Sequence, residues 1–260
     1  MKLKIVENIA SHPFIKLVME DMKPQIANLF LEINKKAEKW DWTSKTKLIL
    51  GDADWYRYDV STKQLAIISI LERIVYSHAF LQKFPSPRSY EQKYEITQYI
   101  WIEYHFFQYM VNVVSLFDCL LILTNSVFCI GLKDSACKPD TIIKNHWILK
   151  VGFDHYLVEF EKLTNRYKEY RNIHLHRGKG KNVAQILNSD NLSFLGMLSF
   201  LQLHSDQFIS NNIIDAGYKV EVMDVIARIE SESSIIETQI SDIFTFLNKI
   251  YLEKRPPIFK

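Results

Sequence analysis

The sequence predicts an all-α protein, a helical bundle, for three reasons. The chain has only seven Gly and seven Pro in 260 residues, so few residues interrupt regular helices. Apolar residues recur at steps of three and four over long stretches, which is the period of an amphipathic helix. With 48% hydrophobic residues, a chain of this length can bury a large core without metals or disulfides.

The first two helices are expected in the N-terminal third. One should run from Pro13 towards Trp40, because proline suits the first helical turn, with a kink or break near Pro24. Between residues 41 and 59 no period holds, and the aromatic residues there predict a loop that either stacks on bases or plugs the edge of a core. A second helix is predicted from Ser61 to about Phe84, where two prolines follow.

The most apolar stretch, from about Tyr90 to Ile130, predicts a helix buried within the bundle. Asp118 interrupts its most hydrophobic segment, Tyr104–Leu132, near the middle, so neither half of that segment reaches the roughly 18 uncharged residues that cross a bilayer. The first ten residues lack the apolar run of a signal peptide, so we expect a cytoplasmic protein with no membrane partner. Three cysteines without CxxC spacing predict buried, reduced thiols.

The remaining helices follow Pro139. A helical region capped by Asp140 or Thr141 is expected to bend at Gly152 and to continue to about residue 176. Two more helices, about Asn191–Leu203 and Tyr218–Lys254, complete the bundle. We expect one compact unit, in which an N-terminal helical extension of residues 1–83 packs on a helical core of residues 84–255.

The segment Arg171-Asn172-Ile173-His174-Leu175-His176 carries the strongest functional signal. When the 2'-hydroxyl of a ribose attacks its own 3'-phosphodiester, protons must move and negative charge builds on the phosphorus oxygens. An imidazole titrates near neutrality, with an ordinary pKa of about 6.5, so it can transfer those protons. A guanidinium presents a charged planar fork that fits phosphate oxygens, and an amide can orient a hydroxyl, a water or the imidazole.

An Arg that is followed directly by Asn and then, after three more residues, by His resembles the motif of HEPN domains, which are small all-helical modules of toxin, defence and RNA-processing proteins. Arg171, Asn172 and His176 match this motif position by position. The resemblance implies a HEPN-like core and metal-independent cleavage of single-stranded RNA without a cofactor. It also implies a homodimer whose two motifs face each other, and an antitoxin or regulatory protein as a further partner.

One position departs from this family pattern. Some HEPN toxins carry a Tyr two residues after the His, and a nucleotidyltransferase partner modifies it. The chain has Gly178 there, so regulation by that route is not expected.

Helical spacing assigns different roles to the two histidines. Asn165, Glu169, Asn172 and His176 share a polar face, so His176 is the predicted catalytic base and acid. His174 continues an apolar stripe, so it is either a packing residue or a substrate contact; the stripe comprises Tyr156, Phe160, Leu163, Tyr167 and Tyr170. Arg171 and His176 lie about 140° apart on a regular helix. A long Arg side chain, fraying before Gly178, or a second motif from a dimer partner would bring them to one phosphate.

Basic residues gather around this motif, although the net charge is only +2. Glu169 alone opposes them between residues 162 and 181; they are Lys162, Arg166, Lys168, Arg171, Arg177, Lys179 and Lys181. Such a field attracts a phosphate backbone. Arg177, Lys179 and Lys181, beside Gly178 and Gly180, either hold the substrate or form a helix stop with solubilising charges.

Two further residue sets bear on the chemistry. Asp118 needs a partner if it is buried: Arg171, which Asp118 would then orient, or a local Ser, Thr or Tyr donor. The histidines have no zinc-like spacing, so no metal is expected.

Two other functions fit the same sequence. The chain can be a non-catalytic HEPN-like module that binds RNA or protein and keeps the motif for phosphate contacts or dimer packing. It can also be a purely structural helical protein.

Overall fold

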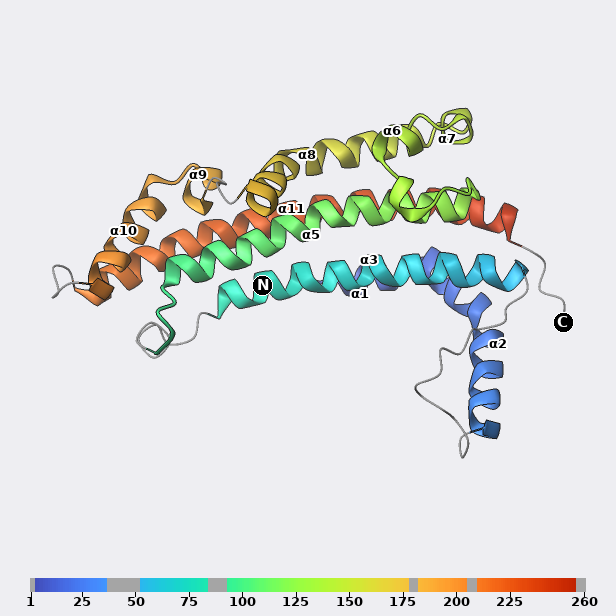
Figure 1. The fold of residues 1–260 in the computed structure, drawn as a ribbon, viewed down its shortest axis with the longest axis horizontal. Helices are drawn as coiled ribbons and strands as arrows, with labels where there is room; N and C mark the ends of the chain where they lie inside the picture. Colours follow the sequence, from blue (N-terminus) through green and yellow to red (C-terminus); the bar gives the residue numbers. More distant parts are fainter. Residues whose placement is uncertain (1–2, 37–51, 84–92, 178–181, 205–209, 256–260) are drawn as a thin grey trace. The chain divides into compact units, whose positions relative to one another are not determined.

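The protein is helical throughout the part that the structure describes, which confirms the all-α prediction. This computed structural model describes residues 3–36, 52–83, 93–177, 182–204 and 210–255, and those residues contain no β-strand (Figure 1). The long helices are α2 (Pro13–Lys36), α3 (Asp52–Gln82), α5 (Gln98–Phe128), α8 (Asp154–Arg177) and α11 (Asn211–Lys254). The shorter ones are α1 (Ile5–Ala10), α6 (Pro139–Ile142), α7 (His146–Lys150), α9 (Val183–Leu187), α10 (Asp190–His204) and the 3-10 helix η2 (Asp134–Ala136).

The chain packs as two compact units that do not follow the order of the sequence. The first unit comprises Met1–Val6, Ser69–Phe117 and Glu159–Thr238, and the second comprises Glu7–Ile68, Asp118–Val158 and Gln239–Lys260. Helices α3, α5, α8 and α11 therefore each contribute one part to each unit. The expected division into residues 1–83 and 84–255 stays a prediction.

Aromatic rings from α5 and α8 form the core of the first unit. Phe117 stacks on Phe160 with ring centroids 6.0 Å apart, and Tyr109 meets Tyr167 edge-on at 6.1 Å. All four side chains are buried, and Ile229 of α11 is buried in the same unit. Offset and edge-on pairs of this kind add to the free energy of apolar burial. This packing fixes α8 against α5 within the first unit.

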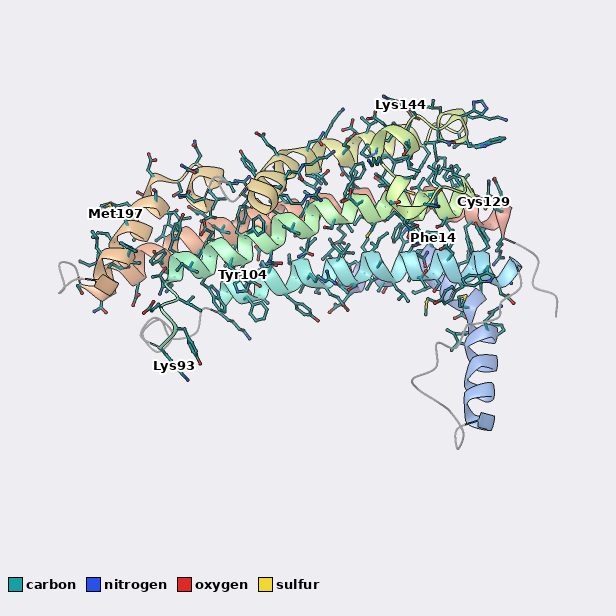
Figure 2. All side chains as sticks on the ribbon, viewed as in Figure 1. Phe14, Lys93, Tyr104, Cys129, Lys144 and Met197 are labelled. Carbon is teal, nitrogen blue, oxygen red and sulfur yellow. The ribbon has the colours of Figure 1, made fainter. Side chains whose placement is uncertain are left out.

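The second unit centres on α2 and the end of α11. Phe14, which Figure 2 labels, meets Phe244 and Tyr251 edge-on, with ring centroids 5.5 and 5.8 Å apart. The Tyr251 hydroxyl donates to the buried Asp21 carboxylate at 3.0 Å, and Arg255 donates to both of its oxygens at 2.9 Å. A buried carboxylate is tolerated when it is paired and hydrogen-bonded in this way.

Helix α3 begins well before the predicted position. The sequence predicts a helix start at Ser61 and a loop over residues 41–59, but the helix begins at Asp52, and residues 41–51 lie outside the described residues. The early turns bury Arg57 and Val60, and Tyr56 stacks on Tyr251 at 5.6 Å. Tertiary packing therefore makes this segment helical although its apolar residues have no regular period.

The helix boundaries after residue 137 correct one prediction and confirm another. Pro139 is the first residue of α6, so the cap is Lys138 rather than Asp140 or Thr141. Thr141 acts from inside the helix, because its Oγ1 accepts the Lys138 N–H at 2.9 Å. At Gly152, where a bend was expected, the backbone has a φ of +69° and separates α7 from α8. Glycine adopts this left-handed conformation without strain.

Helix α5 is apolar and largely buried, as predicted. Asp54–Gln82 and Gln98–Phe128 are both long and apolar enough to cross a bilayer by length and composition alone, and α5 meets that criterion although it includes Asp118. Core helices of soluble proteins have the same properties, and 61% of the apolar window of α5 is buried inside the protein. A cytoplasmic protein without a membrane partner stays a prediction.

The cysteines differ from one another. Cys137 is buried and Cys119 is half-buried, but Cys129 is exposed, so the expectation of three buried thiols is wrong for Cys129. This cysteine follows the last residue of α5, where the chain turns with a φ of +53° and the side chain reaches solvent.

Candidate functional site

The Arg-Asn-x3-His motif lies in the last turns of α8. This helix belongs to the first unit from Glu159 onward, and its backbone is helical through Arg177. Because the helix does not fray within the motif, Arg171 and His176 remain about 140° apart around its axis. Of the three ways to bring them to one phosphate, the long Arg side chain and the second copy of the motif remain.

Two motif side chains contact each other directly. Arg171 is half-buried and Asn172 is exposed, and Arg171 Nε donates to Asn172 Oδ1 at 3.3 Å. This bond occupies the amide oxygen and leaves the amide NH2 of Asn172 oriented away from the guanidinium. The pair can therefore present a charged fork and an amide donor to the same ligand.

The other predicted site residues lie outside the described side chains. His174, His176 and Arg177 have a helical backbone in α8, but their side chains are not described. Lys179 and Lys181 fall in residues 178–181, which are outside the described residues altogether. Their assigned roles, and the assignment of His174 to the core stripe, stay predictions.

The two faces of α8 that precede the motif agree with the predicted pattern. Asn165, Glu169 and Asn172 are exposed, so the polar face reaches solvent. On the apolar stripe, Phe160 and Tyr167 are buried, and Tyr170 is half-buried. Up to Asn172 the helix thus turns one face to the core and keeps the polar face exposed.

A buried carboxylate holds α8 four residues before Arg171. Glu232 of α11 accepts the Tyr167 hydroxyl at 2.6 and 2.9 Å and the Tyr109 hydroxyl at 2.8 Å. Arg166 and Arg228 also reach its Oε1, at 3.0 and 3.1 Å. We call these five residues the Glu232 cluster. It connects α5, α8 and α11 through charge-assisted hydrogen bonds, which are the stronger class.

Burial and charge both perturb the groups of this cluster. Burial raises the pKa of Tyr109 well above its ordinary value, and the neighbouring Glu232 charge raises it further. The same two causes, in the same order, raise the pKa of Tyr167. Partial burial alone would lower the pKa of Arg228, but Tyr167 and Glu232 together outweigh it and raise that pKa. The tyrosines therefore stay neutral donors and the arginine stays charged.

The positive field around the motif is weaker than the sequence indicated. The run 162–181 has only Glu169 as a local acid, but the fold brings Glu232 to Arg166 from the distant helix α11. Lys162 pairs with Glu159 one turn earlier, with 2.6 Å between Nζ and Oε1. Two of the seven cations are therefore partly neutralised by carboxylates outside the run.

Asp118 is exposed rather than buried. The desolvation cost that would require a partner for a buried carboxylate does not apply to it. Its role as a residue that orients Arg171 stays a prediction.

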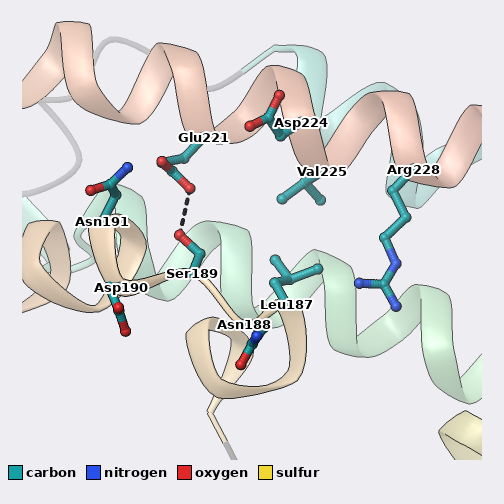
Figure 3. Close-up of a pocket in the computed structure, with 9 residues that line it drawn as sticks. All are labelled: Leu187, Asn188, Ser189, Asp190, Asn191, Glu221, Asp224, Val225 and Arg228. Carbon is teal, nitrogen blue, oxygen red and sulfur yellow. Dashed lines mark hydrogen bonds between the residues drawn. The ribbon is translucent and has the colours of Figure 1, made fainter.

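A cleft of about 510 Å³ opens beside the Glu232 cluster, in the first unit (Figure 3). Leu187 and Val225 give it apolar surface, and Arg228 closes one end. Its other side chains are polar or acidic: Asn188, Ser189, Asp190, Asn191, Glu221 and Asp224. We call it the α9–α11 cleft. Its volume lies in the range of pockets that take small organic ligands.

The turn between α9 and α10 fixes one wall of the cleft. Asn188 ends α9 in the left-handed conformation, with a φ of +59°, and the Ser189 N–H donates to the Ala184 carbonyl at 2.9 Å. Ser189 Oγ accepts the Leu192 N–H at 3.0 Å, which caps α10, and donates to Glu221 at 2.7 Å. No sequence pattern predicts this cleft, because its residues come from two segments that only the fold brings together.

The described residues contain no group of three or more His, Cys, Asp or Glu that could hold a metal ion. Because the side chains of His174 and His176 are outside that part, the expectation of a site without metal stays a prediction.

Comparison with known proteins gives one match. A family model described as HEPN_Cthe2314-like HEPN matches residues 59–248, which include all of α5, α8, α9 and α10 and the motif. No curated protein and no solved structure matches the chain.

Proposed function

The chain belongs to the HEPN_Cthe2314-like HEPN family, and from this premise we propose that it is a metal-independent endoribonuclease that cleaves single-stranded RNA. One observation carries the proposal. Arg171, Asn172 and His176 occupy the end of a helix whose polar face is exposed and whose other face is fixed to the core by Tyr167. Reacting groups have to be held by rigid surroundings, and the Glu232 cluster supplies them here.

The proposed reaction needs no group beyond the protein and the RNA. The 2'-oxygen forms a bond to phosphorus while the bond from phosphorus to the 5'-oxygen breaks, giving a 2',3'-cyclic phosphate and a 5'-hydroxyl. His176 takes the proton from the 2'-hydroxyl and delivers it to the departing 5'-oxygen. Arg171 stabilises the negative charge on the phosphorane oxygens, and Asn172 orients a reacting group through its amide. Arg177, Lys179 and Lys181 hold the RNA backbone.

The proposed active form is a homodimer, and α10 supports it. Phe194, Met197, Phe200 and Leu201 are all exposed and fall on one side of this helix, while Leu192, Leu195 and Ser199 on the other side are buried. Figure 2 labels Met197. A helix that is apolar on its outer side as well as its inner side is typical of an interaction surface. A partner protomer bound here would supply a second copy of the motif, which is one of the two remaining ways to bring an Arg171 and a His176 to one phosphate.

Cleavage in the presence of EDTA tests the proposed function. The full chain should cut single-stranded RNA with EDTA present and leave cyclic phosphate ends, whereas His176→Ala and Arg171→Ala should lower the rate at least about a hundredfold. His155→Ala is the matched control, because His155 is an exposed histidine on the same helix that the mechanism does not use.

Two results would contradict the proposal. If the wild type binds RNA with a steep salt dependence but never cuts it, the protein is a binding module. If His176→Ala cuts at the wild-type rate, the imidazole does not transfer the protons.

A further inference from the structure

Two arginines from different helices are held side by side in the first unit. Arg166 of α8 and Arg228 of α11 both contact Glu232 Oε1, and aromatic rings flank them, with Tyr167 4.9 Å from Arg166 and Phe106 6.0 Å from Arg228. Glu232 itself is buried, but the Arg166 and Arg228 side chains are 42% and 33% exposed. Two guanidinium groups fixed by one buried carboxylate keep a positive charge at the surface and are preorganised for an oxyanion.

The pair lies close to the proposed reaction centre along α8. Arg166 precedes Arg171 by five residues, a rise of about 7.5 Å along a helix. Arg166 and Arg171 also lie about 140° apart around the helix axis, so they contact different phosphates of a strand that wraps around the end of α8.

Arg228 also opens directly onto the α9–α11 cleft, where Figure 3 shows its guanidinium at one end of the lining residues. Leu187 and Val225 offer apolar contact to the face of a flat ring. Asn188 and Asn191 carry amides that hydrogen-bond to base edges. The cleft thus combines a cationic end, an apolar middle and a hydrogen-bonding rim.

The charge of the cleft decides which part of a nucleotide enters it. Three carboxylates line it, those of Asp190, Glu221 and Asp224, against the single cation Arg228. A phosphate is repelled from such a lining except at the arginine end. A carboxylate accepts hydrogen bonds from an exocyclic amino group, as Glu and Asp do from N4 of cytosine. Glu221 is buried and held by Ser189 at 2.7 Å, so its carboxylate is already positioned.

We propose that the Arg166–Arg228 pair and the α9–α11 cleft form a nucleotide-binding subsite. The pair binds another phosphate of the same strand, and the cleft takes the attached base and selects bases that carry an amino group. The inference rests on the proposed function, which supplies RNA as the ligand. In this subsite Glu221 and Asp224 select the base, and the arginine pair provides affinity for any nucleotide.

Binding of mononucleotides to the full chain, measured by calorimetry, tests this subsite. Cytidine and uridine 5'-monophosphate are the probes, because the two bases differ in the amino or carbonyl group at C4. Cytidine monophosphate should bind about tenfold more tightly, in the lower part of the range for a base-specific contact. Glu221→Gln or Asp224→Asn should bring the two affinities together, and Asp242→Asn, an exposed acid on α11 outside the cleft, should leave their ratio unchanged.

The arginine pair has its own variant and control. Arg166→Gln should weaken the binding of both nucleotides about tenfold and keep their ratio, because a charge-assisted phosphate contact is lost. Lys162→Gln, which removes an exposed cation one turn earlier on α8, should leave both affinities unchanged.

The inference is overturned if neither nucleotide binds, if both bind equally, or if Glu221→Gln and Asp224→Asn both leave the ratio unchanged. These outcomes are separate from cleavage, since a mononucleotide has no internucleotide bond to cut. A protein that prefers cytidine monophosphate but leaves RNA intact keeps the subsite and loses the proposed reaction. A protein that cuts RNA but binds the two nucleotides equally keeps the reaction and loses the subsite.

Discussion

Glu232→Gln should destabilise the first unit more than any exposed substitution on α8. The carboxylate accepts hydrogen bonds from two buried tyrosine hydroxyls and contacts two guanidinium groups. A glutamine has a single acceptor oxygen, and its NH2 group would face donors rather than acceptors. The substitution therefore removes the negative charge and leaves buried donors unpaired.

The magnitude follows from how well each partner is buried. Hydrogen bonds to a charged group contribute roughly 1.5–3 kcal/mol each, and breaking a buried ion pair costs roughly 3–5 kcal/mol. The arginines are 42% and 33% exposed, so water replaces part of their contact and their share is small. The tyrosines carry most of the effect, and we expect a loss of about 3 kcal/mol in the free energy of unfolding. Tyr167→Phe should cost about half as much, because Glu232 keeps its other partners.

Urea denaturation at constant pH, followed by far-UV circular dichroism and by fluorescence, measures these losses. Glu169→Gln, at an exposed position on α8, is the control and should change the unfolding free energy by less than about 0.5 kcal/mol. A loss below about 1 kcal/mol for Glu232→Gln, with coincident transitions for both probes, would refute the idea that the cluster holds α8.

Three further predictions concern other parts of the molecule. Burial among aromatic rings lowers the pKa of His105, so the unfolded chain binds the proton more readily than the folded one. The free energy of unfolding should therefore fall as the pH drops below about 6.5. In urea titrations between pH 7 and 5, His105→Gln should make that fall less steep. Asp21→Asn removes the charge that Tyr251 and Arg255 share and should cost about 3 kcal/mol in thermal or urea unfolding, so an unchanged midpoint would contradict the packing of the second unit. Met197→Glu should convert the dimer to a monomer, measured by light scattering, and should lower RNA cleavage, whereas Met197→Leu should do neither. If the Met197→Glu protein remains dimeric, α10 is not part of the dimer interface.

Much of the fold could be predicted from residue patterns, because long helices impose a regular period. The apolar stripe of α8 and the break at Gly152 agree with the structure for this reason. The early start of α3 could not be predicted, since the stacking of Tyr56 on the distant Tyr251 and the burial of Arg57, not a local period, stabilise those turns. Helices α1 and α9 are too short to show a period at all.

For the candidate site, too, residues close in sequence could be predicted and residues that the fold brings together could not. Arg171, Asn172 and His176 are adjacent in sequence, so a motif was enough to single them out. Glu232 belongs to no such motif, although it interrupts the apolar stripe of α11 and follows Arg228 by one helical turn. That interruption was the available signal. Its partners Tyr109 and Tyr167 are more than sixty residues away, so the sequence alone could not connect them.

The connection between α9 and α10 has a consequence for how a ligand would meet the α9–α11 cleft. Its wall is a left-handed Asn188 followed by Ser189, whose amide and hydroxyl are both engaged with the ends of the two helices. Backbone bonds thus set this one wall, so little ordering entropy should be lost there when a ligand enters the cleft. The amides of Ser189 and Leu192 should accordingly exchange with deuterium slowly even in the empty protein.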